Sequence, residues 1–214
     1  MKVIDLTHMI ESGMPVYPGT EPPSFEPANT YEKDGFRETR ITMFTHTGTH
    51  MDPPAHLFRD GMTLDAFPPD RFIGKALVID CTQLHDGEPI TMEHLRPYGD
   101  KLKSADFLLF RLGWDEHWGT EAYFGDYPCI DDFVLDFILS GTYKGIGFDV
   151  IGLDPIKDTN LTRHKKLFMG RDIVNIENLC NLGQCGSDLF WFSCFPLKLR
   201  DSDGAPIRAV AWFE

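Results

Sequence analysis

The stretch HTGTHMDPPAH, residues 46–56, places three histidines and one aspartate within eleven residues. His50 and Asp52 are two residues apart, so on an extended backbone their side chains point to the same face. Gly48 allows a sharp bend before them, because glycine enters positive φ without a steric penalty. The Pro53–Pro54 pair excludes a helix across the stretch and stiffens the chain that leads to the third histidine. The pattern therefore predicts that imidazole and carboxylate groups converge here.

Imidazole and carboxylate are the ligands that suit zinc, manganese or iron in proteins. A single histidine in a loop is usually only a solvated side chain, whereas this cluster with its rigid turn residues indicates a metal site. The cluster offers two or three ligands, so others must come from elsewhere in the chain. His164 and Glu177 are the best candidates. Glu177 ends an apolar strand, where a carboxylate is unexpected unless it has a function. The alternative is that Glu177 is an ordinary acidic residue at a helix N-terminus.

The rest of the chain predicts a mixed α/β protein in which strands outnumber helices. Thr91 is a possible helix N-cap, and apolar residues at helical spacing across residues 131–140 predict a second helix that ends at Gly141. Residues 20–35 contain three prolines and predict a long surface loop. Runs of β-branched and apolar residues predict strands at residues 3–7, 40–45, 75–81, 106–111, 145–149, 173–176, 190–195 and 208–213.

Composition limits the classes of function. The chain has 214 residues and no linker-like segment, which favours a single domain over residues 1–214. A formal net charge of −13 argues against nucleic acid and against anionic membrane surfaces as partners. The first residues form a strand pattern rather than a signal peptide, and no apolar run is long enough to cross a bilayer. Five cysteines without a C-x-x-C pair fit reduced thiols, so we expect a cytoplasmic protein.

Several motifs together resemble the cyclase family of metal-dependent hydrolases, which includes bacterial kynurenine formamidases and isatin hydrolases. The resemblance covers nearly the whole chain, and its most specific part is the H-x-G-T-H-x-D-x-P-x-H pattern at residues 46–56. The other segments that carry it are Asp5–His8, Pro15–Gly19, Arg111–Trp114, Gly147–Asp149, Asp154–Pro155, His164 to Leu179, Pro196–Leu199 and Asp203–Arg208.

The resemblance implies a swivelling β/β/α fold, with mixed β-rich sheets and flanking helices, assembled as a homodimer or homotetramer. It implies that one or two divalent ions, Zn²⁺ or Mn²⁺, are bound, with Asp52 as a possible bridge between two ions. His56 would be the catalytic acid and base. The implied metal ligands are His46, His50, Asp52, His164 and Glu177.

Tyr17 stands where kynurenine formamidases tend to carry tryptophan, and it is the candidate residue for the substrate pocket. Its loop holds two prolines and a glycine within six residues, so the aromatic ring lines a pocket or packs against the core. Five further aromatic residues are compatible with an aryl substrate, although most of them suit the core equally well. They are Phe44, Trp114, Trp118, Tyr123 and Phe124.

These features predict hydrolysis of a C–N bond in a small molecule, with an aryl formamide such as N-formylkynurenine as the substrate. A divalent ion lowers the pKa of bound water from about 16 to near 7, and a histidine with a pKa near 6.5 carries the proton in both directions. No serine or cysteine lies in a context that supports covalent catalysis. Three alternatives remain: ring opening of a lactam or lactone, as in isatin hydrolases; a metal-dependent cyclase or lyase; and a metal-binding protein without turnover.

Overall fold

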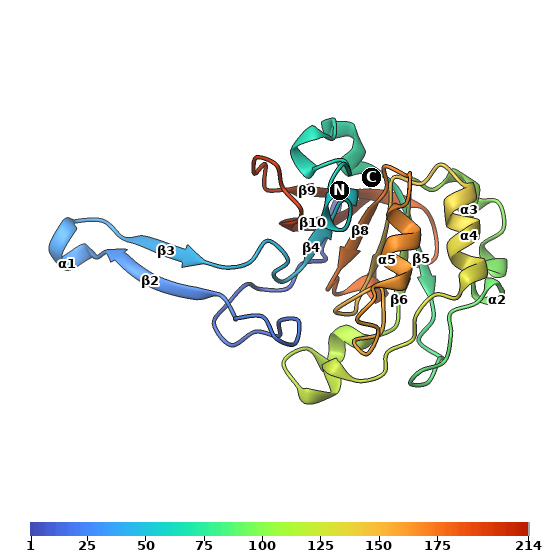
Figure 1. The fold of residues 1–214 in the computed structure, drawn as a ribbon, viewed down its shortest axis with the longest axis horizontal. Helices are drawn as coiled ribbons and strands as arrows, with labels where there is room; N and C mark the ends of the chain where they lie inside the picture. The colour runs from blue at the N-terminus through green and yellow to red at the C-terminus, as the bar shows by residue number, and fades with distance from the viewer. Residues whose placement is uncertain (214) are drawn as a thin grey trace.

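The computed structural model describes residues 1–213, which form a body built on one large sheet and an arm that projects from it (Figure 1). The strands are β1 (Lys2–Asp5), β2 (Ser24–Asn29), β3 (Glu38–Thr42), β4 (His50–Asp52), β5 (Ile73–Asp80), β6 (Phe107–Arg111), β7 (Gly145–Phe148), β8 (Val174–Glu177), β9 (Phe190–Pro196) and β10 (Ala205–Phe213). The helices are α1 (Tyr31–Asp34), α2 (Met92–Leu95), α3 (Lys101–Ser104), α4 (Asp132–Ser140) and α5 (Thr162–Phe168).

The large sheet closes on itself. Its strands follow the order β1-β10-β4-β8-β7-β6-β5-β9, and β9 also pairs with β10, so seven of them form a ring to which β1 is added. The pairs β5–β6, β6–β7 and β7–β8 are parallel, and the other pairs of this sheet are antiparallel. A closed sheet leaves few unpaired strand edges.

Two apolar cores follow from the alternation of side chains along the strands. In β5, Ala76 and Val78 belong to the core enclosed by the ring, whereas Leu77 and Ile79 belong to the core beneath the helices. The second core includes Val134 and other apolar residues of α4 and α5. Both faces of the parallel strands are therefore buried, which explains their nearly continuous apolar sequences.

The helix predicted at residues 131–140 is present, but one of its apolar residues points away from the core. Asp131 caps α4, because its side chain accepts a hydrogen bond of 2.8 Å from the Val134 amide. Val134 and Ile138 are buried, whereas Phe133 is 75% exposed. The spacing alone included Phe133 in the apolar face, and the docking angle of the helix places it outside.

The arm consists of β2, α1 and β3, and two predictions about these residues need correction. Residues 20–35 are not simply a surface loop, since they contain β2 and α1, and β2 pairs with β3 to form a hairpin. The register shifts between Pro27 and Asn29, and such an irregular two-stranded pair tolerates proline because no third strand needs its missing amide. The strand expected at 40–45 ends at Thr42 and lies in this arm (Figure 1).

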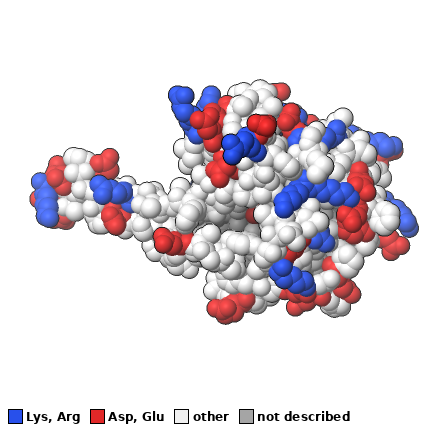
Figure 2. Space-filling model, in the orientation of Figure 1, with Lys and Arg blue, Asp and Glu red and all other residues white. Residues whose placement is uncertain are grey.

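The strands predicted in the body are present within a few residues of their expected limits, and Thr91 accepts a hydrogen bond from the Glu93 amide as the N-cap of α2. All five cysteines are buried and unpaired. Within residues 1–213, every helix is too short or too polar to span a bilayer. Figure 2 shows acidic and basic side chains scattered over the visible face, without a continuous basic patch there.

Candidate metal centre

Two neighbouring strands carry the centre of the site. In the antiparallel pair β4–β8, His50 lies opposite Glu177 and Asp52 lies opposite Asn175. The residues between them, Met51 among others, point into the core enclosed by the ring. Because side chains alternate along a strand, these four polar residues share the opposite face, beside α5. The predicted shared orientation of His50 and Asp52 is confirmed.

The backbone before β4 orients His50. Gly48 has φ of +64°, as predicted from its place in the motif, and its carbonyl oxygen turns toward the His50 ring. His50 Nδ1 donates to this oxygen over 2.8 Å, and the ring therefore directs Nε2 at the carboxylates. Nε2 lies 3.3 Å from Asp52 Oδ1 and 3.5 Å from Glu177 Oε2.

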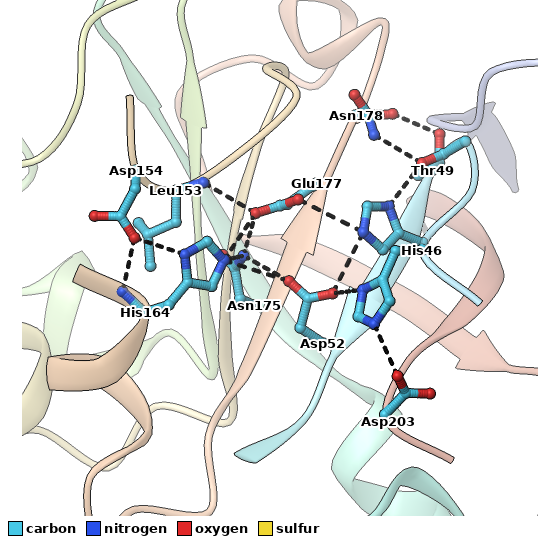
Figure 3. Close-up of polar contacts among 12 residues, drawn as sticks. His46, Thr49, Asp52, Leu153, Asp154, His164, Asn175, Glu177, Asn178 and Asp203 are labelled. Carbon is cyan, nitrogen blue, oxygen red and sulfur yellow. Dashed lines mark hydrogen bonds and ion pairs between the residues drawn. The ribbon is translucent and has the colours of Figure 1, made fainter. Parts of the chain in front are cut away.

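Asp52 lies between two groups of histidines, as Figure 3 shows. Its Oδ1 is 2.7 Å from His46 Nδ1, and its Oδ2 is 3.6 Å from His164 Nε2. The Asp52 side chain is almost completely buried. Asp52 therefore contacts His46 with one carboxylate oxygen and faces His164 with the other.

His164 reaches the cluster from α5. It is buried, although Arg163, Lys165 and Lys166 surround it in the sequence. Its Nδ1 donates to Asp154 Oδ2 over 2.7 Å, and Asp154 also accepts hydrogen bonds from the amides of Arg163 and His164 at the start of α5. This pairing turns His164 Nε2 toward Glu177 Oε1, 3.1 Å away.

Glu177 ends β8 and points into the cluster. The next helical element, a 3-10 turn at Leu182–Gln184, begins five residues later, so the alternative role as a helix N-terminal acid is wrong. Its Oε1 accepts a hydrogen bond of 2.9 Å from the Leu153 amide. Its Oε2 faces His50, so this side chain, like Asp52, contacts both sides of the cluster.

The charges of the cluster fit a divalent ion. Asp52 and Glu177 are buried, and within residues 1–213 no lysine or arginine forms an ion pair with either of them. Burial alone would lower the pKa of His50, but the two carboxylates outweigh it and raise this pKa to about 9. The carboxylates thus attract positive charge, which a bound cation supplies without protonation of the histidines.

The positions of the donor atoms agree with this. Three sets of three residues each bring three ligand atoms within 4.8 Å of one another, and two of these sets share Asp52. His46 Nε2 is also buried without a hydrogen-bond partner among the described residues. The two sets that share Asp52 are His46, His50 and Asp52, and Asp52, His164 and Glu177; the third set, at the edge of the cluster, is His46, His56 and Asp203.

His56 lies beside the cluster rather than in it. Its ring centroid is 4.1 Å from that of His46 and 6.1 Å from that of His164. It sits at the end of a short 3-10 turn, Pro54–His56, and no α-helix crosses residues 46–56, as the prolines predicted. Pro54 fits because the first position of such a turn needs no amide hydrogen. Burial lowers the pKa of His56 below 6.5, so the ring is neutral at pH 7.

A cavity of about 390 Å³ opens in front of these residues. Tyr17 lines this cavity, which was one of the two positions expected for its ring. The cluster residues and His56 form the floor of the cavity. The five other aromatic residues that were compatible with an aryl substrate do not line this cavity. Trp114 and Tyr123 are buried in the core, whereas Phe44 is exposed.

Four polar residues of the site had no role in the sequence interpretation. Asp154 orients His164, and Asp203 Oδ2 lies 3.5 Å from His46 Nε2. Asn178 donates to the Gly48 carbonyl, which also holds His50. Asn175 lies two residues before Glu177 in β8, just as His50 lies two residues before Asp52 in β4. Its position on the face of the site therefore followed from the sequence.

The closed sheet and this cluster of histidines and carboxylates, with a neutral histidine beside it, define a metal-dependent hydrolase. A family model described as "Putative cyclase" matches residues 4–155, which is more than half of the chain. The chain belongs to this cyclase family.

Curated relatives are similar over almost the whole chain. A kynurenine formamidase of Bacillus cereus is 30% identical over 208 residues, which are 97% of this chain and 95% of the relative. A kynurenine formamidase of Bacillus anthracis is 29% identical over 210 residues, which are 98% of this chain and 96% of the relative.

Solved structures have the same fold. Isatin hydrolase A from Ralstonia solanacearum superposes with a TM-score of 0.88 at 23% identity, over 100% of this chain and 92% of that one. A predicted metal-dependent hydrolase from Bacillus stearothermophilus has a TM-score of 0.75 at 27% identity, over 98% and 97% of the two chains. The predicted α/β class with the swivelling β/β/α fold is confirmed.

Proposed function

We propose that this hydrolase cleaves the C–N bond of a small amide, with an aryl formamide such as N-formylkynurenine as its substrate. The observation that carries the proposal is the cluster at the floor of the 390 Å³ cavity, with His56 beside it. Zn²⁺ or Mn²⁺, as one or two ions, suits the mixture of imidazole and carboxylate donors. The proposed ligands are His46, His50, Asp52, His164 and Glu177.

A bound divalent ion would polarise the substrate carbonyl and bring the pKa of a water molecule near 7. The protein's own contribution is to hold the donors and to move a proton. His56 faces the cavity as a neutral imidazole, so it accepts the proton of the attacking water. The protonated ring then returns this proton to the leaving nitrogen, which departs as an amine. Its position outside the cluster leaves it free for this transfer.

The cavity supports a small substrate with an apolar part. Its volume lies within the range of about 300–1,000 Å³ that is usual for small-molecule pockets. Tyr17, Ile151 and Leu161 line it opposite the polar floor, so an aryl group has apolar surface to contact. The formamide bond is supported by the curated relatives, which are kynurenine formamidases.

Ring opening of a lactam or lactone is the second candidate function. It uses the same donors, and the isatin hydrolases share the fold, although an identity of 23–24% supports the fold alone. A cyclase or lyase reaction on the same site stays a third possibility. The metal-binding protein without turnover is disfavoured, because the relatives over the whole chain are hydrolases.

The experiment compares substrates on protein reloaded with Zn²⁺ or with Mn²⁺. An aryl formamide, isatin and an aryl lactone are supplied at equal concentrations, and release of formate or of the ring-opened acid is measured. The proposal expects the highest kcat/KM for the aryl formamide. A higher value for isatin or the lactone would assign ring opening instead, and no turnover of any of them would reject both candidates.

We also propose that the chain forms a homo-oligomer through its arm, which deepens the sequence prediction of a dimer or tetramer. The arm projects from the body, and an isolated two-stranded hairpin is only marginally stable in water (Figure 1). Large apolar side chains are exposed here, with Ile41 of β3 at 50% and Phe44, two residues after β3, at 52%. A second copy of the chain would cover them, and the mixed charges at the tip, visible in Figure 2, suit contact with a similarly mixed surface.

Light scattering after size-exclusion chromatography tests the arm. The double substitution of Ile41→Asp and Phe44→Asp should shift the protein to the mass of one chain. Phe133→Asp is the matched control, since this exposed phenylalanine lies on α4, on the side of the body away from the arm. A monomeric unsubstituted protein, or an unchanged mass in the double variant, would contradict the proposal.

A further inference from the structure

Asn175 is a completely buried asparagine whose side chain lies inside the cluster. It stands opposite Asp52 in the neighbouring strand β4 and two residues before Glu177 in β8. Both relations place it on the same face of the sheet as these carboxylates. It does not line the cavity, so it closes the cluster from the buried side.

The amide nitrogen of Asn175 contacts every member of one half of the cluster, as Figure 3 shows. Nδ2 donates to Asp52 Oδ2 over 3.1 Å and to Glu177 Oε1 over 2.8 Å. It lies 3.3 Å from His164 Nε2. These three partners are the residues of the second set of metal donors.

The contact with Asp52 determines how this carboxylate is shared. Oδ1 faces His46 and His50, and Oδ2 faces His164. A carboxylate whose two oxygens face different partners needs a fixed orientation. The hydrogen bond from Asn175 Nδ2 to Asp52 Oδ2 fixes this orientation from the buried side of the cluster. The bond to Glu177 Oε1 does the same for the second carboxylate, which also accepts the Leu153 amide.

The fold itself does not need an amide at this position. Asn175 Oδ1 is buried and has no hydrogen-bond partner in the described part of the chain. An unpaired buried polar atom costs about 1–3 kcal/mol, and asparagine is disfavoured in strands. An apolar side chain would avoid this cost, so the contribution of Asn175 lies in the site.

We propose that Asn175 is a positioning residue for the Asp52–His164–Glu177 half of the centre and raises its affinity for a divalent ion. The inference rests on the proposed function in one respect, namely that the cluster holds such an ion. Residues that hydrogen-bond to metal ligands typically change metal affinity by about 10–100-fold. Asn175 acts on two ligands at once, so we expect an effect in this range.

The test is a calorimetric titration of chelator-stripped protein with Mn²⁺. Asn175→Leu keeps the approximate volume of the side chain and removes the donor. Its Mn²⁺ affinity should fall about 10–100-fold. Asn160→Leu is the control for the same chemical change, since Asn160 is exposed in the loop before α5, and its affinity should not change. Asn175→Thr retains one donor on a residue that suits a strand, and it should bind with intermediate affinity.

A double-mutant cycle separates positioning from general stability. His164→Ala removes one of the donors of the half that Asn175 serves, so adding Asn175→Leu to it should cause a smaller further loss than Asn175→Leu causes alone. A purely structural role would instead give additive losses and a lower melting temperature of the metal-free protein. Either that result or an unchanged affinity in Asn175→Leu would overturn the assignment. Absence of Mn²⁺ binding by the unsubstituted protein would reject the metal centre itself, which is a distinct outcome.

Discussion

Replacement of His56 by alanine separates proton transfer from metal binding. His56 forms no ion pair with Asp52 or Glu177 in the described chain, and its ring lies beside the rings of His46 and His164. Removal of the ring therefore leaves the carboxylates and their partners in place. We expect His56→Ala to keep its fold and its metal content.

The size of the expected loss in kcat follows from the protonation state of the His56 ring. Burial lowers the pKa of His56 below 6.5, so more than about 90% of it is neutral at pH 7.5 and available as a base. A positioned general acid or base contributes about 10²–10⁴-fold, which corresponds to roughly 3–5 kcal/mol of barrier. His56→Ala should therefore lose kcat by a factor of this size.

The pH dependence gives a second measurement. With His56 present, kcat/KM should fall as the pH drops through the pKa of this ring, because protonation removes the base. In His56→Ala this acidic limb should disappear. Metal content is measured by mass spectrometry, and kcat is measured with the aryl formamide as substrate. His85→Ala is the control, because His85 is exposed and lies outside the cavity. Unchanged kcat would make His56 a bystander, and loss of metal would make it a ligand.

Three further substitutions test the site and its surroundings. His50→Ala should lose most of the bound metal, and a folded variant with full metal content would exclude His50 as a ligand. Burial lowers the pKa of His8 from 6.5 to about 4, so it contributes stability that is complete above pH 6.5 and lost as the pH falls through 4. Urea unfolding of His8→Phe should lack that part of the pH dependence. Gly48→Ala should destabilise by more than about 1 kcal/mol, and by more than Gly13→Ala. Both glycines have positive φ, but only a Cβ at Gly48 meets Ile10, at 3.1 Å, so equal losses in thermal unfolding would contradict the packing argument.

The local patterns that predicted the body of the protein are short-range effects. The alternation of His50 and Asp52, the positive φ at Gly48 and the capping of α4 by Asp131 depend on neighbours within a few residues, so the sequence displays them directly. The arm was misjudged because three prolines suggested a loop. Proline excludes interior strands, whereas a two-stranded hairpin without further neighbours accommodates it.

The sequence by itself determined the chemistry available to this protein: histidines and carboxylates in a rigid motif, in a chain that resembles the cyclase family. Only the tertiary structure decided how these groups meet. His50 contacts Glu177 across the β4–β8 pair, although 126 residues separate them in the chain. The helix α5 brings His164 to the same point, and Asp154 fixes its orientation. Such contacts depend on strand order and helix docking, which are collective properties of the core, so no local pattern records them.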